Sequence, residues 1–365
     1  MCVRPGLVSR MFVHSDPSRG LYAVRLFHNG SFKTVVLDDV VPTNRGRPIF
    51  ASGVESSGSA LWVVLLEKAY AKLHGSYANI EGGFVSQAMS DCTGGVPSSL
   101  ALTDSTDLPR NWAEIVSHFR NGHLLGAGSS AGKDTDINSL GIVQGHAYSI
   151  LDVQEVDGHQ LLRARNPWGQ REWTGRWSDK SDEWTPRLKK LLSYKDEDDG
   201  SFWICYQDFC RYFRVVYVCK VYDGWHTSSV SGEWSVARGT AGGCTNHRES
   251  FATNPQYLLQ TSGSEAISIV LTQHDQLAPD GAALAESLPC GLYAVNARAR
   301  LSKAPLQRDI LGASAFSYTR DTALELDMRA DCPVVIVPCA FDAGMENSFS
   351  VRVYSKDGGV SIVAL

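Results

Sequence analysis

The chain has 365 residues, an ordinary apolar content and a formal net charge of −5 at pH 7. This length indicates two domains, with three as the alternative, and allows a sizeable buried core. The charge is small and spread along the chain, so no basic stripe points to nucleic acid as a partner. Polyanion binding is therefore excluded from the expected functions.

The cysteines and the apolar runs indicate the compartment. Nine cysteines form an odd set without a CxxC pair, and several lie inside apolar runs, as Cys219 and Cys339 do. No apolar run reaches the roughly 18 residues that span a bilayer, and the first residues lack the apolar core of a signal peptide. We therefore expect reduced thiols in a cytoplasmic protein.

The N-terminal region predicts a hairpin and then a helix. Residues 7–13 are compatible with either a helix or a strand. Alternating apolar residues predict two paired strands at 21–27 and 32–38. Apolar side chains spaced i, i+3, i+4 then predict an amphipathic helix from Leu61 to Leu73, whose stripe packs on the core.

A second helix is predicted from Pro109 to Arg120, with the proline in its first turn and Asp107 as its cap. A short strand follows at residues 124–129. The polar run at residues 130–139 predicts a mobile surface loop.

Two further apolar runs, at residues 147–153 and 160–164, predict antiparallel strands joined by a turn at residues 156–158. This hairpin delivers His146 at the head of one strand and Asn166 just past the end of the next. In a cysteine protease, a histidine takes the thiol proton and later returns it to the leaving amine, while a carboxamide oxygen holds the imidazole in the productive tautomer. Taken singly, each residue also fits a satisfied histidine or an Asn-Pro turn.

Together, the segments GHAYS, RNPWG and EWTGRW resemble the pattern around the catalytic His and Asn of calpains. The segments LWVVLLEKAYAKLHGSY and DCTGG upstream, and DGSFWICYQDF downstream, are similar to further parts of that family. The resemblance implies that His146 is the general base and Asn166 the orienting residue. Trp168 would cover their hydrogen bond and keep water from it.

The resemblance also implies a fold for residues 1–214. They are expected to form an α+β papain-like protease-core subdomain, the second subdomain of the calpain core, with the core incomplete at its N-terminus. In calpains the nucleophilic cysteine lies upstream, in a GDCW segment that opens a helix, and no GDCW occurs in these 365 residues. Only Cys2 lies on the correct side, without the helix start that activates a thiol. The chain is therefore expected to be inactive as it stands.

Residues 215–365 change character to alternating apolar runs and many turns, which predict an antiparallel sandwich. The segments GTAGGC, NPQY and VVIVPCAFDAGMENSFSVRVYS resemble the all-β C2-like domain of calpains, domain III. Such a domain is expected to contact phospholipid at a membrane periphery or to dock on the protease core. The sparse acidic residues Asp275, Asp280 and Glu286 predict a solvated loop. The predicted strands are residues 267–272, 291–299, 323–328, 332–337 and 349–354.

An acidic run at residues 195–200 is by composition a solvated turn. The calpain resemblance implies instead a calcium site built from Glu172, Asp179 and Asp199. Ser201 stands where a further carboxylate is expected. Since calcium needs roughly six to eight oxygen ligands, we expect any Ca²⁺ binding here to be weak.

Three functional hypotheses follow. In the first, the chain belongs to a longer calcium-responsive cysteine endopeptidase of the atypical calpain branch, which lacks EF-hands. In the second, it is a pseudoenzyme, a non-enzymatic homologue that binds a protein, a peptide or phospholipid. In the third, a separate polypeptide complements it with the cysteine-bearing subdomain. The first is favoured, because a pure scaffold has no need of the His146, Asn166 and Trp168 set.

Overall fold

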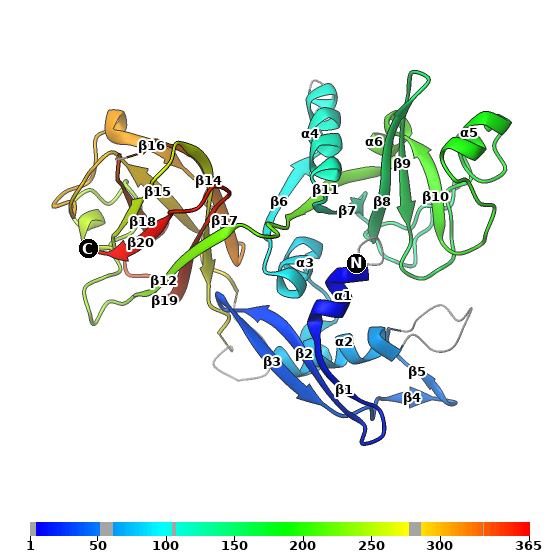
Figure 1. Ribbon diagram of the computed structural model, residues 1–365, viewed down its shortest axis with the longest axis horizontal. Helices are drawn as coiled ribbons and strands as arrows, with labels where there is room; N and C mark the ends of the chain where they lie inside the picture. The colour runs from blue at the N-terminus through cyan, green and yellow to red at the C-terminus, as the bar shows by residue number, and fades with distance from the viewer. Residues whose placement is uncertain (1–4, 52–60, 104–106, 277–285, 331) are drawn as a thin grey trace.

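The computed structural model describes residues 5–51, 61–103, 107–276, 286–330 and 332–365. The sheets of three or more strands form three groups (Figure 1). The first is the three-stranded sheet β1–β3, called the small sheet below, the second is a six-stranded sheet built from β6 to β11, and the third consists of two sheets built from β12 to β20. Among the described residues, no helix is long and apolar enough to cross a membrane.

The first group is an antiparallel sheet with the order β1-β2-β3, covered by helix α2. Asn29 and Gly30 both have positive φ and form the tight turn between β2 and β3, as the twist of a two-residue hairpin requires. Leu65 and Ala69 of α2 are buried against this sheet. The elements are α1 (Pro5–Met11), β1 (Phe12–Asp16), β2 (Leu21–His28), β3 (Ser31–Leu37), β4 (Thr43–Asn44), β5 (Arg47–Pro48), α2 (Leu61–Leu73) and the 3-10 turn η1 (Ala78–Ile80).

The second group is a six-stranded antiparallel sheet with the order β10-β9-β8-β7-β11-β6. Trp112 and Ile115 of α4 and Phe209 of α6 are buried in its core. Helix α3 contacts both this sheet and β2 of the small sheet, and so joins the first two groups (Figure 1). The elements are α3 (Val85–Thr93), β6 (Val96–Ala101), α4 (Leu108–Arg120), β7 (Leu124–Ser129), β8 (Ala147–Val156), β9 (His159–Arg165), α5 (Pro186–Leu191), β10 (Ser201–Cys205), α6 (Tyr206–Tyr212) and β11 (Phe213–Lys220).

The third group consists of two antiparallel sheets that share one apolar core, the sandwich from here on. Their strand orders are β12-β19-β14-β17 and β16-β15-β18-β13-β20. Ile269 of β14 and Ile336 of β18 meet in the core beside Trp234. The elements are β12 (His226–Trp234), η2 (Phe251–Thr253), β13 (Tyr257–Gln260), β14 (Glu265–Gln273), β15 (Cys290–Val295), η3 (Gln307–Asp309), β16 (Ile310–Ala313), β17 (Asp321–Met328), β18 (Val334–Ala340), β19 (Asn347–Ser355) and β20 (Ser361–Ala364).

Charged and polar side chains fasten the sandwich to the first two groups. Arg320, which precedes β17, reaches Asp91 of α3 with its two Nη atoms at 2.5 and 3.2 Å. Arg352 of β19 donates to the carbonyl of Gly94 at 2.9 Å and lies over the ring of Phe27. These contacts are buried, so the sandwich and the rest of the chain share an interface rather than a bare linker.

The predicted helix Leu61–Leu73 and the predicted strand at residues 124–129 have the bounds seen in the structure. Residues 7–13 divide between α1 and β1. Asp107 precedes α4, but its side chain makes no capping hydrogen bond, so the predicted cap is wrong. Its backbone is already helical, whereas a capping residue is extended. Strand β11 crosses the boundary predicted between residues 214 and 215.

Replacing Arg320 with leucine should destabilise the whole chain. The side chain is 6% exposed and pairs with Asp91 and Asp321. Removing it leaves buried carboxylates without a counter-charge, which costs about 3–5 kcal/mol. Urea unfolding followed by tryptophan fluorescence measures the change.

Arg308→Leu is the matched control, because Arg308 is 82% exposed and its carboxylate neighbour lies 3.9 Å away. That variant should unfold at the same urea concentration as the unmodified chain. Equal unfolding midpoints for Arg320→Leu and Arg308→Leu would contradict the importance given to the buried pair.

Candidate functional site

Strand register brings His146 and Asn166 to the same end of the six-stranded sheet. In the hairpin of β8 and β9, Ser149 pairs with Arg165. His146 lies three residues before Ser149, and Asn166 lies one residue after Arg165. Both residues therefore lie at the open end of the β8–β9 strand pair. At the other end, a two-residue turn with positive φ joins the two strands.

The side chain of Asn166 is fully buried and makes several hydrogen bonds at this end of the strands. Its Oδ1 lies 3.0 Å from Nε2 of His146 and also accepts a hydrogen bond from the backbone N–H of Trp168 at 3.1 Å. Its Nδ2 donates to the carbonyl of Arg171 at 3.3 Å, and its backbone N–H to that of Gly200 at 2.8 Å. A carboxamide partnered on both sides keeps one orientation. Nε2 of His146 must then be the donor toward Oδ1.

His146 is held by its backbone and leaves its other ring nitrogen available. Its N–H donates to Oγ of Ser129 at 2.9 Å, and its carbonyl accepts from the N–H of Ser129, the last residue of β7, at 3.0 Å. Because Nε2 carries the proton, the neutral ring has its lone pair at Nδ1. No described residue makes a hydrogen bond to that atom. Nδ1 is therefore free to accept a proton.

Two aromatic rings flank the imidazole of His146. The Trp168 ring lies 4.4 Å away between centroids, tilted by 44°, and Trp168 is 45% exposed. The ring of Tyr148 stands edge-on at 5.2 Å, and its hydroxyl accepts the N–H of Val143 at 2.9 Å. Trp168 thus lies against the imidazole while its own outer surface stays open to solvent.

The His146–Asn166 pair can perform general acid–base chemistry. An imidazole with one nitrogen fixed by a carboxamide and the other free can take a proton from a nucleophile and return it to a leaving group. The arrangement needs a nucleophile near Nδ1. Among the described residues, no side-chain hydroxyl or thiol makes a hydrogen bond to it.

The described thiols are poorly suited to be that nucleophile. Burial raises the pKa of most of them, to about 11 for Cys210 and about 12 for Cys219. A raised pKa keeps a cysteine in the unreactive thiol form. Cys2 lies outside the described residues. Burial is the leading cause of the raised pKa at Cys92, Cys205, Cys210, Cys219, Cys290 and Cys339.

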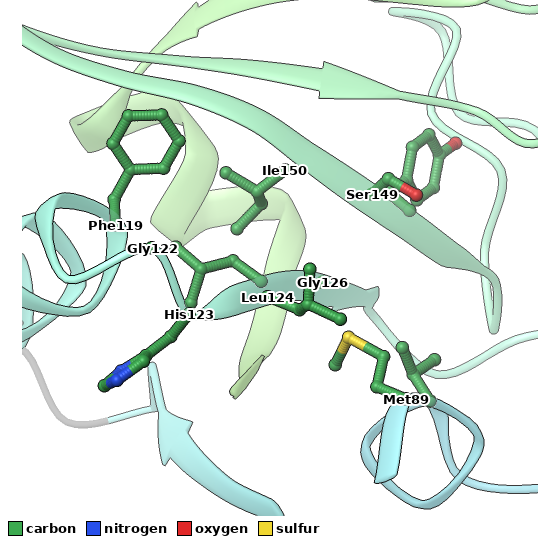
Figure 2. Close-up of a pocket in the computed structure, with 11 residues that line it drawn as sticks. Met89, Phe119, Gly122, His123, Leu124, Gly126, Ser149 and Ile150 are labelled. Atoms are coloured by element: carbon green, nitrogen blue, oxygen red, sulfur yellow. The ribbon is translucent and has the colours of Figure 1, made fainter. Parts of the chain in front are cut away.

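A mainly apolar hollow of about 340 Å³ lies beside this end of the β8–β9 strand pair, between α3, α4 and the strands β7 and β8. Phe119, Met89 and Ile150 surround it (Figure 2). Tyr148 lines the hollow and also contacts the ring of His146. Tyr148 is thus the residue that the hollow and the surroundings of His146 have in common.

The predicted metal ligands Glu172, Asp179 and Asp199 lie near one another, but their carboxylates do not gather. Burial and then repulsion, first from Glu172, raise the pKa of Asp179 to about 7. Oε1 of Glu172 accepts the N–H of Gly200 at 2.7 Å, and Oδ1 of Asp199 accepts the N–H of Ser201 at 2.8 Å. The three do not form a group with ligand atoms within 4.8 Å of one another.

Arginines supply part of the counter-charge in this acidic region. Arg163 donates to Oγ of Ser201 at 3.0 Å, and Arg165 donates to the carbonyl of Asp199 at 3.2 Å. A guanidinium thus lies beside Ser201, the position where a further carboxylate was expected. The charge of the region suits a cation, but its geometry does not fit Ca²⁺ in this conformation. Weak Ca²⁺ binding by these residues stays a prediction.

Three residues of the site were not singled out from the sequence. Ser129 holds the backbone of His146, the ring of Tyr148 stands edge-on to the imidazole, and the carbonyl of Gly200 accepts the N–H of Asn166. The predicted strand at residues 124–129 ends at Ser129, which is the signal that could have placed it opposite the histidine. The loop that follows is held by hydrogen bonds from Leu140 and Ile142 to Oδ1 of Asn138.

Two family models match the chain. The one described as calpain family cysteine protease matches residues 2–220, and the one described as calpain large subunit, domain III, matches residues 230–354. The first match covers more than half of the chain and contains both His146 and Asn166.

Curated relatives support the same family. The calpain-type cysteine protease DEK1 of Arabidopsis thaliana is 38% identical over 92% of this chain and 16% of its own length. Calpain-5 of Mus musculus is 30% identical over 93% of this chain and 59% of its own length. The calpain-2 catalytic subunit of Gallus gallus is 36% identical over 67% of this chain and 37% of its own length. The chain thus spans less than two thirds of each of these relatives.

Replacing Asp179 with asparagine should stabilise the chain at alkaline pH. The carboxyl of Asp179 has a folded-state pKa of about 7, above its usual value of 3.8, so folding opposes its ionisation. Its cost to stability is absent below the usual pKa, grows as the pH rises through 7, and is then fully present. Because solvent screens a half-buried group, we expect a gain of about 1 kcal/mol at pH 8 and none at pH 4.

Urea unfolding at the two pH values, in chelator, measures this difference. Asp182→Asn is the control, because Asp182 is exposed on the same segment. A stabilisation by Asp179→Asn that is equal at pH 4 and pH 8 would show that the carboxyl is not strained by its neighbours.

Proposed function

This chain belongs to the calpain family of cysteine proteases, and we propose that it supplies the general base and the orienting amide of a calpain-type endopeptidase. The observation that carries the proposal is the 3.0 Å contact between Nε2 of His146 and Oδ1 of Asn166. The free Nδ1 supports it further, since a base needs an unoccupied lone pair directed away from its orienting partner.

In the proposed reaction, Nδ1 of His146 takes the proton of a cysteine thiol, and the thiolate attacks the carbonyl carbon of the peptide substrate. The C–N bond then breaks, and the imidazolium returns its proton to the leaving amine. Asn166 keeps Nε2–H as the donor throughout, so that the ring neither turns nor changes tautomer. Water next attacks the thioester with His146 again as base, which frees the acid product and the thiol.

The thiol in this proposal comes from a cysteine outside the described residues. The raised pKa values of the described thiols support this, because a nucleophilic cysteine needs a lowered pKa. The apolar hollow lined by Met89, Phe119 and Ile150 suits an apolar side chain of the substrate.

The same family membership supports three finer proposals. Residues 1–214 act as the papain-like second subdomain of the protease core. Residues 215–365 act as a C2-like module that contacts phospholipid at the cytoplasmic surface of a membrane. Calcium responsiveness would come from Glu172, Asp179 and Asp199, in a region where burial, and then repulsion from neighbouring carboxylates, raises the pKa of Asp179. Ca²⁺ would have to draw these carboxylates together.

The proposed role of His146 is tested in a chimera. A calpain subdomain that carries the nucleophilic cysteine is fused ahead of this chain, and casein cleavage is measured with calcium and with chelator. His146→Ala should lower kcat at least about a thousandfold with little change in KM, because it removes the base. Asn166→Ala should lower kcat less, since the ring remains but loses its orientation.

His14→Ala is the control, because His14 is an exposed histidine on β1. It should leave both kcat and KM unchanged. A folded chimera that cleaves casein equally well with and without His146 would rule out the proposed base. A folded chimera without any cleavage would favour a non-enzymatic role in binding protein or phospholipid.

A further inference from the structure

A cluster of two histidines and an aspartate lies where the sandwich meets the small sheet. His28 ends β2, His74 directly follows α2, and Asp275 follows β14. Their ligand atoms all lie within 4.8 Å of one another, the single group of its kind among the described residues. Three segments far apart in sequence thus bring two imidazoles and a carboxylate to one point.

The polar atoms in this cluster are buried without hydrogen bonds. Nδ1 of His28 and Oδ2 of Asp275, which face each other, make no hydrogen bond in the described structure, and neither does Nε2 on the other side of the His74 ring. The side chain of His74 is only 5% exposed, and that of Asp275 15%. Burial of unpartnered polar atoms is costly, so such a group requires a physical explanation.

The separations between these atoms are too long for hydrogen bonds and close to those of ligands around one metal ion. Oδ2 of Asp275 lies 3.7 Å from Nδ1 of His28 and 3.9 Å from Nδ1 of His74. Zinc bonds of about 2.0–2.2 Å place two ligands of a tetrahedral site about 3.4 Å apart. The two separations from Oδ2 of Asp275 are a few tenths of an ångström longer than this value.

The region around the cluster has an excess of negative charge, which favours binding of a divalent cation. Asp91, Asp275 and Asp321 surround a single guanidinium, that of Arg320. These three carboxylates and one guanidinium together carry two negative charges in excess.

A second carboxylate lies on the other side of the His74 ring. Nε2 of His74 faces Oδ2 of Asp91 at 3.7 Å, and that oxygen accepts the hydroxyl of Tyr70 at 2.8 Å. Arg320 holds the other oxygen of Asp91 at 2.5 Å. A carboxylate on the far nitrogen is the usual support of a histidine that ligates a metal. Arg320 forms an ion pair with Oδ2 of Asp275 at 3.6 Å, a separation too long for a hydrogen bond.

We propose that His28, His74 and Asp275 bind a zinc ion that fastens the sandwich to the N-terminal sheet and helix. Two imidazoles and one carboxylate match zinc rather than calcium, which prefers oxygen ligands. A water completes the four ligands, and a surface hollow of about 420 Å³ that Asp275 and Arg320 help to line provides the entry path. The ion is structural and independent of the proposed peptidase chemistry.

Zinc titration of the purified 365-residue chain, freed of metal by chelator and dialysis, tests the site. Calorimetry should show one equivalent of zinc bound, and cobalt in its place should give the visible absorption of a tetrahedral ion. Zinc should also raise the thermal unfolding midpoint by several degrees, because it binds only the assembled interface.

Asp275→Asn and His28→Gln should each weaken zinc binding at least about a hundredfold and remove the cobalt absorption. His247→Gln is the matched control. Its Nε2 lies 3.8 Å from Oδ1 of Asp342, a similar pair at the surface without a third ligand among the described residues. That variant should bind zinc like the unmodified chain.

Two results would overturn the proposal. One is a folded, unmodified chain that binds no stoichiometric zinc, whatever the variants do. The other is zinc binding that survives both Asp275→Asn and His28→Gln.

Discussion

The buried guanidinium of Arg320 determines how the parts of this chain are joined. It pairs with Asp91 on α3 and with Asp321 at the start of β17, so that it ties a helix of the first half to a strand of the sandwich. An isolated charge is too costly to bury, so the ion pairs form only when both parts are in place. The interface is thereby selective for one arrangement of the domains, even where its net contribution to stability is modest.

Helix α3 extends this constraint toward the His146–Asn166 pair. Asp91 lies on the face of α3 that meets the sandwich, while Val85 and Met89 of the same helix line the hollow that also touches Tyr148. The ring of Tyr148 stands edge-on to His146. One helix therefore contributes both to the interface with the sandwich and to the wall of the hollow.

The sequence specified local features well and long-range contacts poorly. Hairpin register follows from alternation and turn residues, so the sequence alone was enough to place His146 and Asn166 together. Asp275 was predicted to lie in a solvated loop, which is wrong, because its N–H donates to Oδ1 of Asn29 and its side chain meets His28. Glu286 is exposed as predicted, and Asp280 lies outside the described residues. No local sequence pattern shows that Asp275, rather than Asp280 or Glu286, contacts the β2–β3 hairpin.

Gly200 joins the acidic region to the His146–Asn166 pair through hydrogen bonds that the sequence alone did not predict. Its φ of +83° favours glycine, and a side chain there would collide with the carbonyl of Asn166. Its N–H donates to Glu172, while its carbonyl accepts the N–H of Asn166. A single residue thus separates the carboxylate from the backbone of the orienting asparagine. Glu172 and Asn166 are therefore joined by two successive hydrogen bonds, both made by the backbone of Gly200.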